Sequence, residues 1–105
     1  MKTPHDLLSL LSRHVGRDNG VAVKALAAEL DITDRQVREL VSDLRMSGHA
    51  VCGHPRDGYY IAETPEEMEE TCQFLRNRAM HSLQLESRLR NIPMPDLLGQ
   101  LHLNT

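Results

Sequence analysis

The chain has 105 residues and a net charge of −3, with 40% hydrophobic and 26% charged residues. These proportions are typical of one small soluble globular domain with an appendage. Because only 3% of the residues are aromatic, stacking on single-stranded nucleic acid is disfavoured. Met1-Lys2 is not followed by an apolar run, and no stretch is long enough to span a membrane. We therefore expect a cytoplasmic protein in which Cys52 and Cys72 are free, buried thiols.

The first predicted helix begins at Pro4, because Thr3 can cap it and proline suits the first helical position. Gly16 is expected to help end this helix. A turn is predicted at residues 17–20, followed by a short strand at residues 21–23 that pairs with a later hairpin. The apolar face of the helix comes from four leucines: Leu7, Leu8, Leu10 and Leu11.

Two further helices joined by a tight turn are predicted between Val23 and Met46. Apolar residues recur at helical spacing in both: Leu26, Ala27 and Leu30, then Val37, Leu40, Val41 and Leu44. Ile32 can fill the angle between two crossing helices. Thr33 can cap the second helix, since its hydroxyl accepts an orphan backbone N–H. This arrangement is typical of a helix-turn-helix, in which the second helix enters the major groove of DNA.

The outward side of the second helix carries the candidate base contacts. Counting about 100° per residue, that side holds Arg35, Glu39, Ser42 and Met46, with Gln36 and Arg38 on its flanks. Arginine binds guanine and glutamine binds adenine through paired hydrogen bonds. Glu39 can accept from a cytosine amino group or pair with Arg35 within the helix. Any solvated helix face carries such residues, so a plain helical core or a protein-binding module remains an alternative.

A β-hairpin is predicted directly after this helix. Gly48 occupies the position where helices end in a left-handed residue. Residues 49–52 and 59–62 have the composition of short strands, and residues 53–58 between them are rich in turn formers. A hairpin in this place is typical of a wing.

Residues 6–62 resemble the winged-helix domain found at the N-terminus of biotin repressors. The matching segments are LLSLL, LDITDRQVRELVSDLRMSG and GYYIAETP. The resemblance covers a little over half of the chain and implies sequence-specific DNA binding through the second helix and the wing. It places Thr33, Arg35, Gln36 and Arg38 at helix contact positions and His54 and Arg56 at the wing tip. Ala22 departs from the pattern by lacking a capping oxygen, and no biotin-ligase domain follows, so biotin chemistry is not carried over.

The charge distribution weakens the expected affinity for DNA. Five of the fifteen acids crowd into residues 63–70, after the wing. Residues 21–61 still hold five basic residues against six acids. Affinity that depends on phosphate neutralisation should therefore be low. Binding as a dimer would compensate through effective concentration.

A long helix is predicted from Thr64 to about Asn91, before Pro93. Thr64 and Glu67 form a capping box around Pro65. A seam near coiled-coil spacing is expected to pack partly on the domain and partly against a second copy, with purely intramolecular packing as the alternative. The seam residues are Met68, Cys72, Leu75, Ala79 and Leu83. Basic residues in the second half either touch phosphates or complement the helix terminus: Arg76, Arg78, His81, Arg88 and Arg90.

After Pro93 and Pro95 break the chain, residues 96–103 form a short amphipathic tail capped by Asp96, too short to be a stable helix alone. The tail is expected to dock on its own domain, on a dimer mate or on another protein. Cys52 and His54 are the only close Cys/His pair, which is too few ligands for zinc. With no phosphate loop or nucleophile motif either, we expect no enzyme, metal site or cofactor.

The sequence thus predicts a mainly α fold with a small β-hairpin wing. Residues 1–62 form the winged-helix domain, residues 63–92 the long C-terminal helix, and residues 93–105 the tail. The expected function is a homodimeric, sequence-specific regulator of transcription that binds double-stranded DNA. A winged-helix adaptor that binds protein in a nucleic-acid-associated assembly is the alternative.

Overall fold

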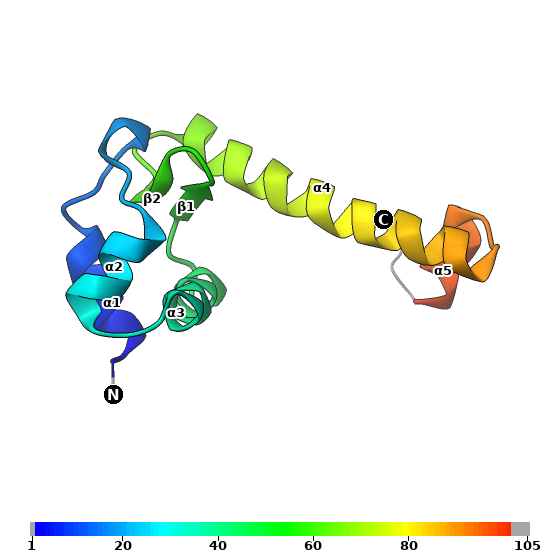
Figure 1. Cartoon of the computed structure of the whole chain (residues 1–105). Helices are drawn as coiled ribbons and strands as arrows, with labels where there is room; N and C mark the ends of the chain where they lie inside the picture. The colour runs from blue at the N-terminus through cyan, green and yellow to red at the C-terminus, as the bar shows by residue number, and fades with distance from the viewer. Residues whose placement is uncertain (1, 102–105) are drawn as a thin grey trace. The chain divides into compact units, whose positions relative to one another are not determined.

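A computed structural model describes residues 2–101 as two compact units, which divide between Thr71 and Cys72. Within that range the chain is mainly helical, with one two-stranded antiparallel hairpin, as the composition and periodicity predict. Figure 1 shows that α1, α2 and α3 gather around the hairpin in the first unit. The elements of that unit are α1 (Pro4–Leu11), the short 3₁₀ helix η1 (Arg17–Asn19) within the predicted turn, α2 (Val23–Leu30), α3 (Asp34–Met46), β1 (Val51–His54), β2 (Gly58–Ile61) and the start of α4 (Pro65–Arg90).

The helix α1 begins as predicted and ends earlier than predicted. The Thr3 hydroxyl accepts the Asp6 backbone N–H at 3.3 Å, and the Asp6 carboxylate accepts the Thr3 N–H at 2.8 Å. The expectation that Gly16 ends the helix is wrong, because the last helical residue is Leu11. The chain leaves the helix early enough for the Gly16 N–H to donate to the Ile61 carbonyl at 2.8 Å. Gly16 therefore helps to attach the hairpin instead.

The turn between α2 and α3 is built by one left-handed residue and one cap. Asp31 has φ +55°, and the Ile32 N–H donates back to the Ala27 carbonyl at 3.0 Å. Ile32 is half-buried against the core, as predicted. The Thr33 hydroxyl accepts the Gln36 backbone N–H at 3.1 Å, which confirms the predicted cap. The start of α2 at Ala22 has no side-chain cap, also as predicted.

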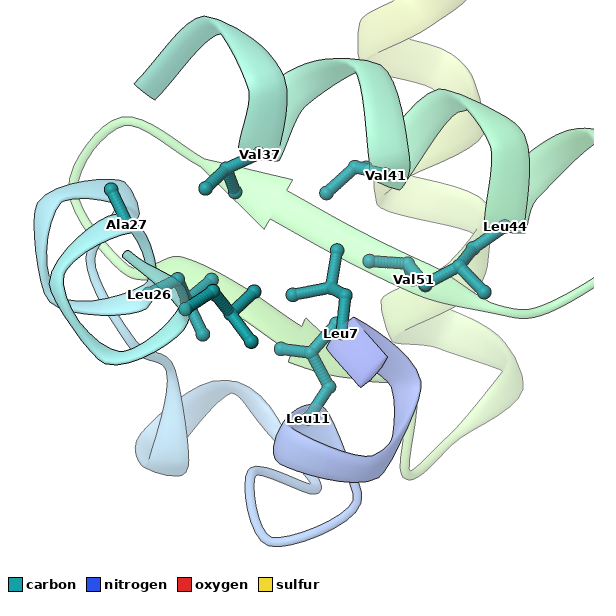
Figure 2. Packing of buried hydrophobic residues seen from close by; sticks show 9 residues of the cluster. Leu7, Leu11, Leu26, Ala27, Val37, Val41, Leu44 and Val51 are labelled. Carbon is teal, nitrogen blue, oxygen red and sulfur yellow. The ribbon is translucent and has the colours of Figure 1, made fainter. Parts of the chain in front are cut away.

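The core of the first unit is aliphatic and lies between α1, α2, α3 and β1 (Figure 2). Leu7 points from α1 toward Val41 of α3 and Val51 of β1. Burying one such leucine contributes about 1.5–3 kcal/mol. The apolar stripe of α3 is thereby held inward, which leaves its opposite side in solvent. The cluster consists of Leu7, Leu11, Leu26, Ala27, Leu30, Val37, Val41, Leu44 and Val51.

The predicted hairpin is present, with strands shifted by one or two residues. The helix α3 ends at Met46. Gly48 follows two residues later, and its φ of +92° and N–H bond to the Arg45 carbonyl at 3.0 Å match the predicted left-handed terminus. The strands pair with His54 opposite Gly58 at the loop. The loop closes through the Asp57 N–H bond to the His54 carbonyl at 3.1 Å, and Gly58 follows with φ +76°. A tight turn followed by a left-handed glycine is a common hairpin connection.

The hairpin is also paired with the segment between α1 and α2. Val21 and Tyr59 exchange two backbone hydrogen bonds of 2.8 Å. The predicted strand at residues 21–23 is therefore reduced to a single bridge, because α2 already begins at Val23. A second bridge, between Val15 and Ile61, was not predicted. These bridges anchor the hairpin on the side away from α3.

Glu67 attaches the start of α4 to the rest of the first unit. The Thr64 hydroxyl accepts the Glu67 N–H at 3.2 Å, as the predicted capping box requires. The Glu67 carboxylate accepts the Glu63 N–H at 2.8 Å and the Arg17 N–H at 3.0 Å, and its backbone contact with Thr64 is the weakest of the three. The bond from Glu63, followed by that from Arg17, lowers the pKa of Glu67. Arg17 also forms an ion pair with Glu70.

Replacing Glu67 by glutamine should make the unfolding free energy less dependent on pH. Since the folded pKa lies below the ordinary value of 4.5, the carboxylate stabilises the fold above that pH. This contribution is lost as the pH falls toward the folded pKa. Urea unfolding from pH 7 to pH 3 should therefore show Glu67→Gln less stable than wild type at neutral pH, with the two converging in acid. Glu66→Gln, whose side chain makes no such backbone bonds, is the control, and an equal effect of both changes would contradict the prediction.

The second unit consists of the remainder of α4 and α5 (Met94–Gln100). The helix α4 ends at Arg90. Asn91 follows with φ +56°, and the Ile92 N–H donates to the Ser87 carbonyl at 3.1 Å. The prediction that Asp96 caps the tail is wrong, because α5 already starts at Met94. Pro95 fits within its first turn, where no intrahelical N–H is needed. Residues 102 and 103 of the predicted tail lie outside the described range.

Candidate nucleic-acid interface

The outward side of α3 presents every helix residue predicted to contact DNA. Val37, Val41 and Leu44 point into the core and are at most 3% exposed. At 3.6 residues per turn, the positions on the opposite side of the helix must then face solvent. The exposed set, together with the cap residue Thr33, comprises Arg35, Gln36, Arg38, Glu39, Ser42, Asp43 and Met46.

Gln36 also has a structural role that the sequence interpretation did not include. The Gln36 side-chain oxygen accepts the Thr33 backbone N–H at 2.9 Å and completes a capping box. Paired recognition of adenine requires that same oxygen to accept from the adenine amino group. Gln36 must therefore share or release its capping bond to bind adenine. The two arginines are the stronger candidates for base contacts.

The charges on this face nearly cancel. Arg35 is 88% exposed, and its Nε lies 3.3 Å from a Glu39 oxygen one turn later, so the predicted intrahelical pair is present. Asp43 is also exposed and was overlooked in the sequence interpretation. Counting about 100° per residue places it nearer the middle of the face than Arg38. Two arginines thus face two carboxylates, which limits attraction to phosphate and leaves specific hydrogen bonds as the main source of affinity.

The tip of the hairpin presents one extended arginine. The Arg56 side chain is 83% exposed, and its Nε lies 3.8 Å from Asp57. The predicted contact His54 supports the loop, since its ring Nδ1 accepts the Arg56 backbone N–H at 3.1 Å. Asp57 in turn lies 3.9 Å from the Arg17 Nε. The loop is therefore stabilised by contacts among its own residues and with Arg17. Arg56 is the residue best placed to contact a phosphate.

Arg45 is a positioning residue that the sequence interpretation counted only as a charge. Its Nε donates to the Val51 carbonyl at 2.8 Å, and the residue is half-buried. This bond joins the last turn of α3 to the first residue of β1. It therefore helps to set the hairpin against α3. This contact could have been suspected from the sequence, because Arg45 lies on the flank of α3 in its last turn, shortly before the hairpin.

The side chains of the predicted dimer seam on α4 are mostly exposed in the single chain. Met68 is 45% and Leu75 is 41% exposed, while Leu83 is half-buried. Cys72 and Ala79 are exposed as well. The expectation that Cys72 is buried is therefore wrong, because few side chains of the second unit are buried, whereas Cys52 is buried as expected.

Within residues 2–101, no cluster of three or more His, Cys, Asp or Glu side chains is arranged to hold a metal ion. No helix in the same range combines the length and apolar character needed to cross a membrane. No family model, curated protein or solved structure matches the chain. Assigning a function therefore depends on the geometry and chemistry of the surfaces described above.

Proposed function

We propose that the first unit is a winged helix-turn-helix domain that binds double-stranded DNA sequence-specifically and regulates transcription in the cytoplasm. In this proposal α3 enters the major groove and the β1–β2 hairpin contacts the flanking backbone. The observation that carries the proposal is the exposed pair Arg35 and Arg38 on a helix whose opposite side is locked into the core. The order of two helices, a tight turn and a hairpin supports it.

Arg35 and Arg38 would supply most of the sequence discrimination. Each well-formed arginine–guanine pair contributes about 1–3 kcal/mol of discrimination against the wrong base. Arg35 would give up its ion pair with Glu39 to bind the guanine edge. At a mismatched base, Arg35 would lose this ion pair without gaining the two hydrogen bonds to guanine. Arg56 would add a phosphate contact, which fixes orientation and carries no sequence information.

A binding assay with a matched charge control tests this proposal. Duplexes would be selected from a random library, and the best one titrated by fluorescence anisotropy at low and moderate salt. Arg35→Ala with Arg38→Ala should weaken binding more than about thirtyfold through the lost base contacts. Arg13→Ala with Lys24→Ala removes the same charge from exposed positions elsewhere in the unit and should weaken it less than about tenfold.

Two results would overturn the proposal. Absence of duplex binding at low salt would do so, because sequence-independent affinity is strongest there. Equal losses in the two double variants would show that only net charge matters. A third variant, Arg56→Ala, should reduce affinity for all duplexes by a similar factor and make it less sensitive to salt.

A protein-binding adaptor is the second candidate, favoured by the neutral charge of the α3 face and by one exposed apolar side chain. Met46 is 88% exposed at the end of α3. Methionine is common at binding surfaces because it adapts its shape. Met46→Lys separates the two candidates, since it adds a favourable charge for DNA and disrupts an apolar protein contact. Duplex binding that is retained or strengthened in this variant supports the DNA proposal.

A further inference from the structure

The second unit contains very little buried apolar surface. Among its described residues, Leu97 is the one buried hydrophobic side chain, with 1% of its surface exposed. The helix α4 meanwhile continues without interruption to Arg90. A helix that is not packed against anything is marginally stable in water. A partner that covers this part of α4 would provide the missing burial.

Four large side chains form an apolar face on this part of α4. Phe74, Leu75, Leu85 and Leu89 are 37%, 41%, 52% and 85% exposed. At about 100° per residue they fall within an arc of about 100°. They form two patches, one at Phe74 and Leu75 and one at Leu85 and Leu89. Arg78 separates the patches, with its guanidinium carbon 5.9 Å from the centre of the Phe74 ring.

The charges of α4 are strongly polarised along its length. Its N-terminal turns carry Glu66, Glu67, Glu69 and Glu70 and no basic residue. Its last turns carry Arg88 and Arg90, with Glu86 as the acid nearby. Such a helix is complementary to a second copy that runs in the opposite direction. A parallel, in-register pair would instead place acids on acids and Arg78 on Arg78.

We propose that the apolar face of α4 binds a second copy of this chain in antiparallel orientation, in a register that sets Leu75 opposite Leu85. In this register each apolar patch meets the other patch of its mate. Glu70 then lies within one helical turn of the mate's Arg88 on the same flank of the pair, and Arg78 lies opposite Ser82 rather than opposite itself. This interface does not involve the residues proposed to contact DNA. The resulting two-fold symmetric dimer would carry two copies of the first unit.

The contribution of the apolar face is tested by light scattering and sedimentation of the full chain. Wild type should have about twice the chain mass of 11.9 kDa at tens of micromolar. Leu85→Ala with Leu89→Ala keeps good helix formers and should weaken self-association at least about tenfold. Met80→Ala is the control, because Met80 is 37% exposed on the opposite side of α4 and should have little effect.

The orientation is tested by cross-linking in a Cys72→Ser background. A disulfide needs Cα atoms within about 7 Å. Mixing Leu75→Cys protein with Leu85→Cys protein should therefore give a covalent dimer on mild oxidation. Leu75→Cys alone should not, since the two thiols would be about 15 Å apart along the helices. Cys52 is buried and should not interfere.

Charge reversal gives an independent check of orientation. Glu70→Lys should weaken self-association about fivefold, as should Arg88→Glu. Combining the two changes should restore it, although each change alone opposes the helix dipole. A monomer at about 100 micromolar, covalent dimers from Leu75→Cys alone, or no recovery in the double variant would overturn the proposal.

Discussion

Replacing Gly20 by alanine should destabilise the first unit by about 3 kcal/mol, at the upper end of overpacking costs. Gly20 has an ordinary φ of −59°, so the cost does not come from backbone strain. A Cβ atom at this position would overlap the backbone carbonyl oxygen of Asp57 in the hairpin loop. Neither atom belongs to a flexible side chain. Either the loop or the turn before α2 must therefore move, which would break the neighbouring bridge between Val21 and Tyr59.

Gly48→Ala is the matched control for this prediction. Gly48 has φ +92°, but an added Cβ would meet no atom within 4 Å. Its cost should be limited to the left-handed backbone, about 1 kcal/mol. Urea unfolding of the two variants at neutral pH compares the two effects directly. Similar losses in both would contradict the close packing of the loop against Gly20.

Local patterns in the sequence predicted most of the helical framework. The spacing of Val37, Val41 and Leu44 identified the buried side of α3, because helical geometry leaves little choice once one side is apolar. Thr3 and Thr33 identified two helix starts, since their caps involve residues only three positions away. Features of this kind depend on neighbouring residues alone.

Contacts between distant segments could not be predicted in the same way. The bond from the Arg17 N–H to Glu67 joins residues fifty positions apart, and periodicity carries no information about it. The bridge between Val15 and Ile61 has the same character. The sequence favoured a reciprocal cap with Thr64, but the two short bonds of the Glu67 carboxylate are to the neighbouring Glu63 N–H and to the distant Arg17 N–H.

The sequence predicted which residues of the candidate interface are exposed, but it predicted less well what each of them does. Helical counting placed Arg35 and Arg38 on the outside, and both are exposed. The same counting did not show that Arg45 bonds to β1, which depends on side-chain geometry. The role of Gln36 could have been predicted, since Thr33 and Gln36 have the spacing of a capping box. Asp43 was overlooked, although the spacing alone places it on the face.

Replacing Leu7 by alanine should cost about 2–5 kcal/mol of unfolding free energy. Leu7 is 0% exposed and lies between α1, α3 and β1, as Figure 2 shows. The cavity left by the leucine would lie directly beneath Val41. A small domain has only about 5–15 kcal/mol of stability, so the loss is a large part of the total. Thermal and urea unfolding would measure it.

The same variant also tests whether the core positions α3 for DNA, under the proposed function. Leu8→Ala is the control, because Leu8 is half-buried on the same helix and should cost clearly less. At a temperature where both variants stay folded, Leu7→Ala should bind the selected duplex more weakly than Leu8→Ala, although neither change touches the outward side of α3. A cavity beneath α3 would make this helix more mobile. More conformational entropy would then be lost when Arg35 and Arg38 are ordered on the bases. Equal affinities with unequal stabilities would show instead that α3 keeps its position without support from Leu7.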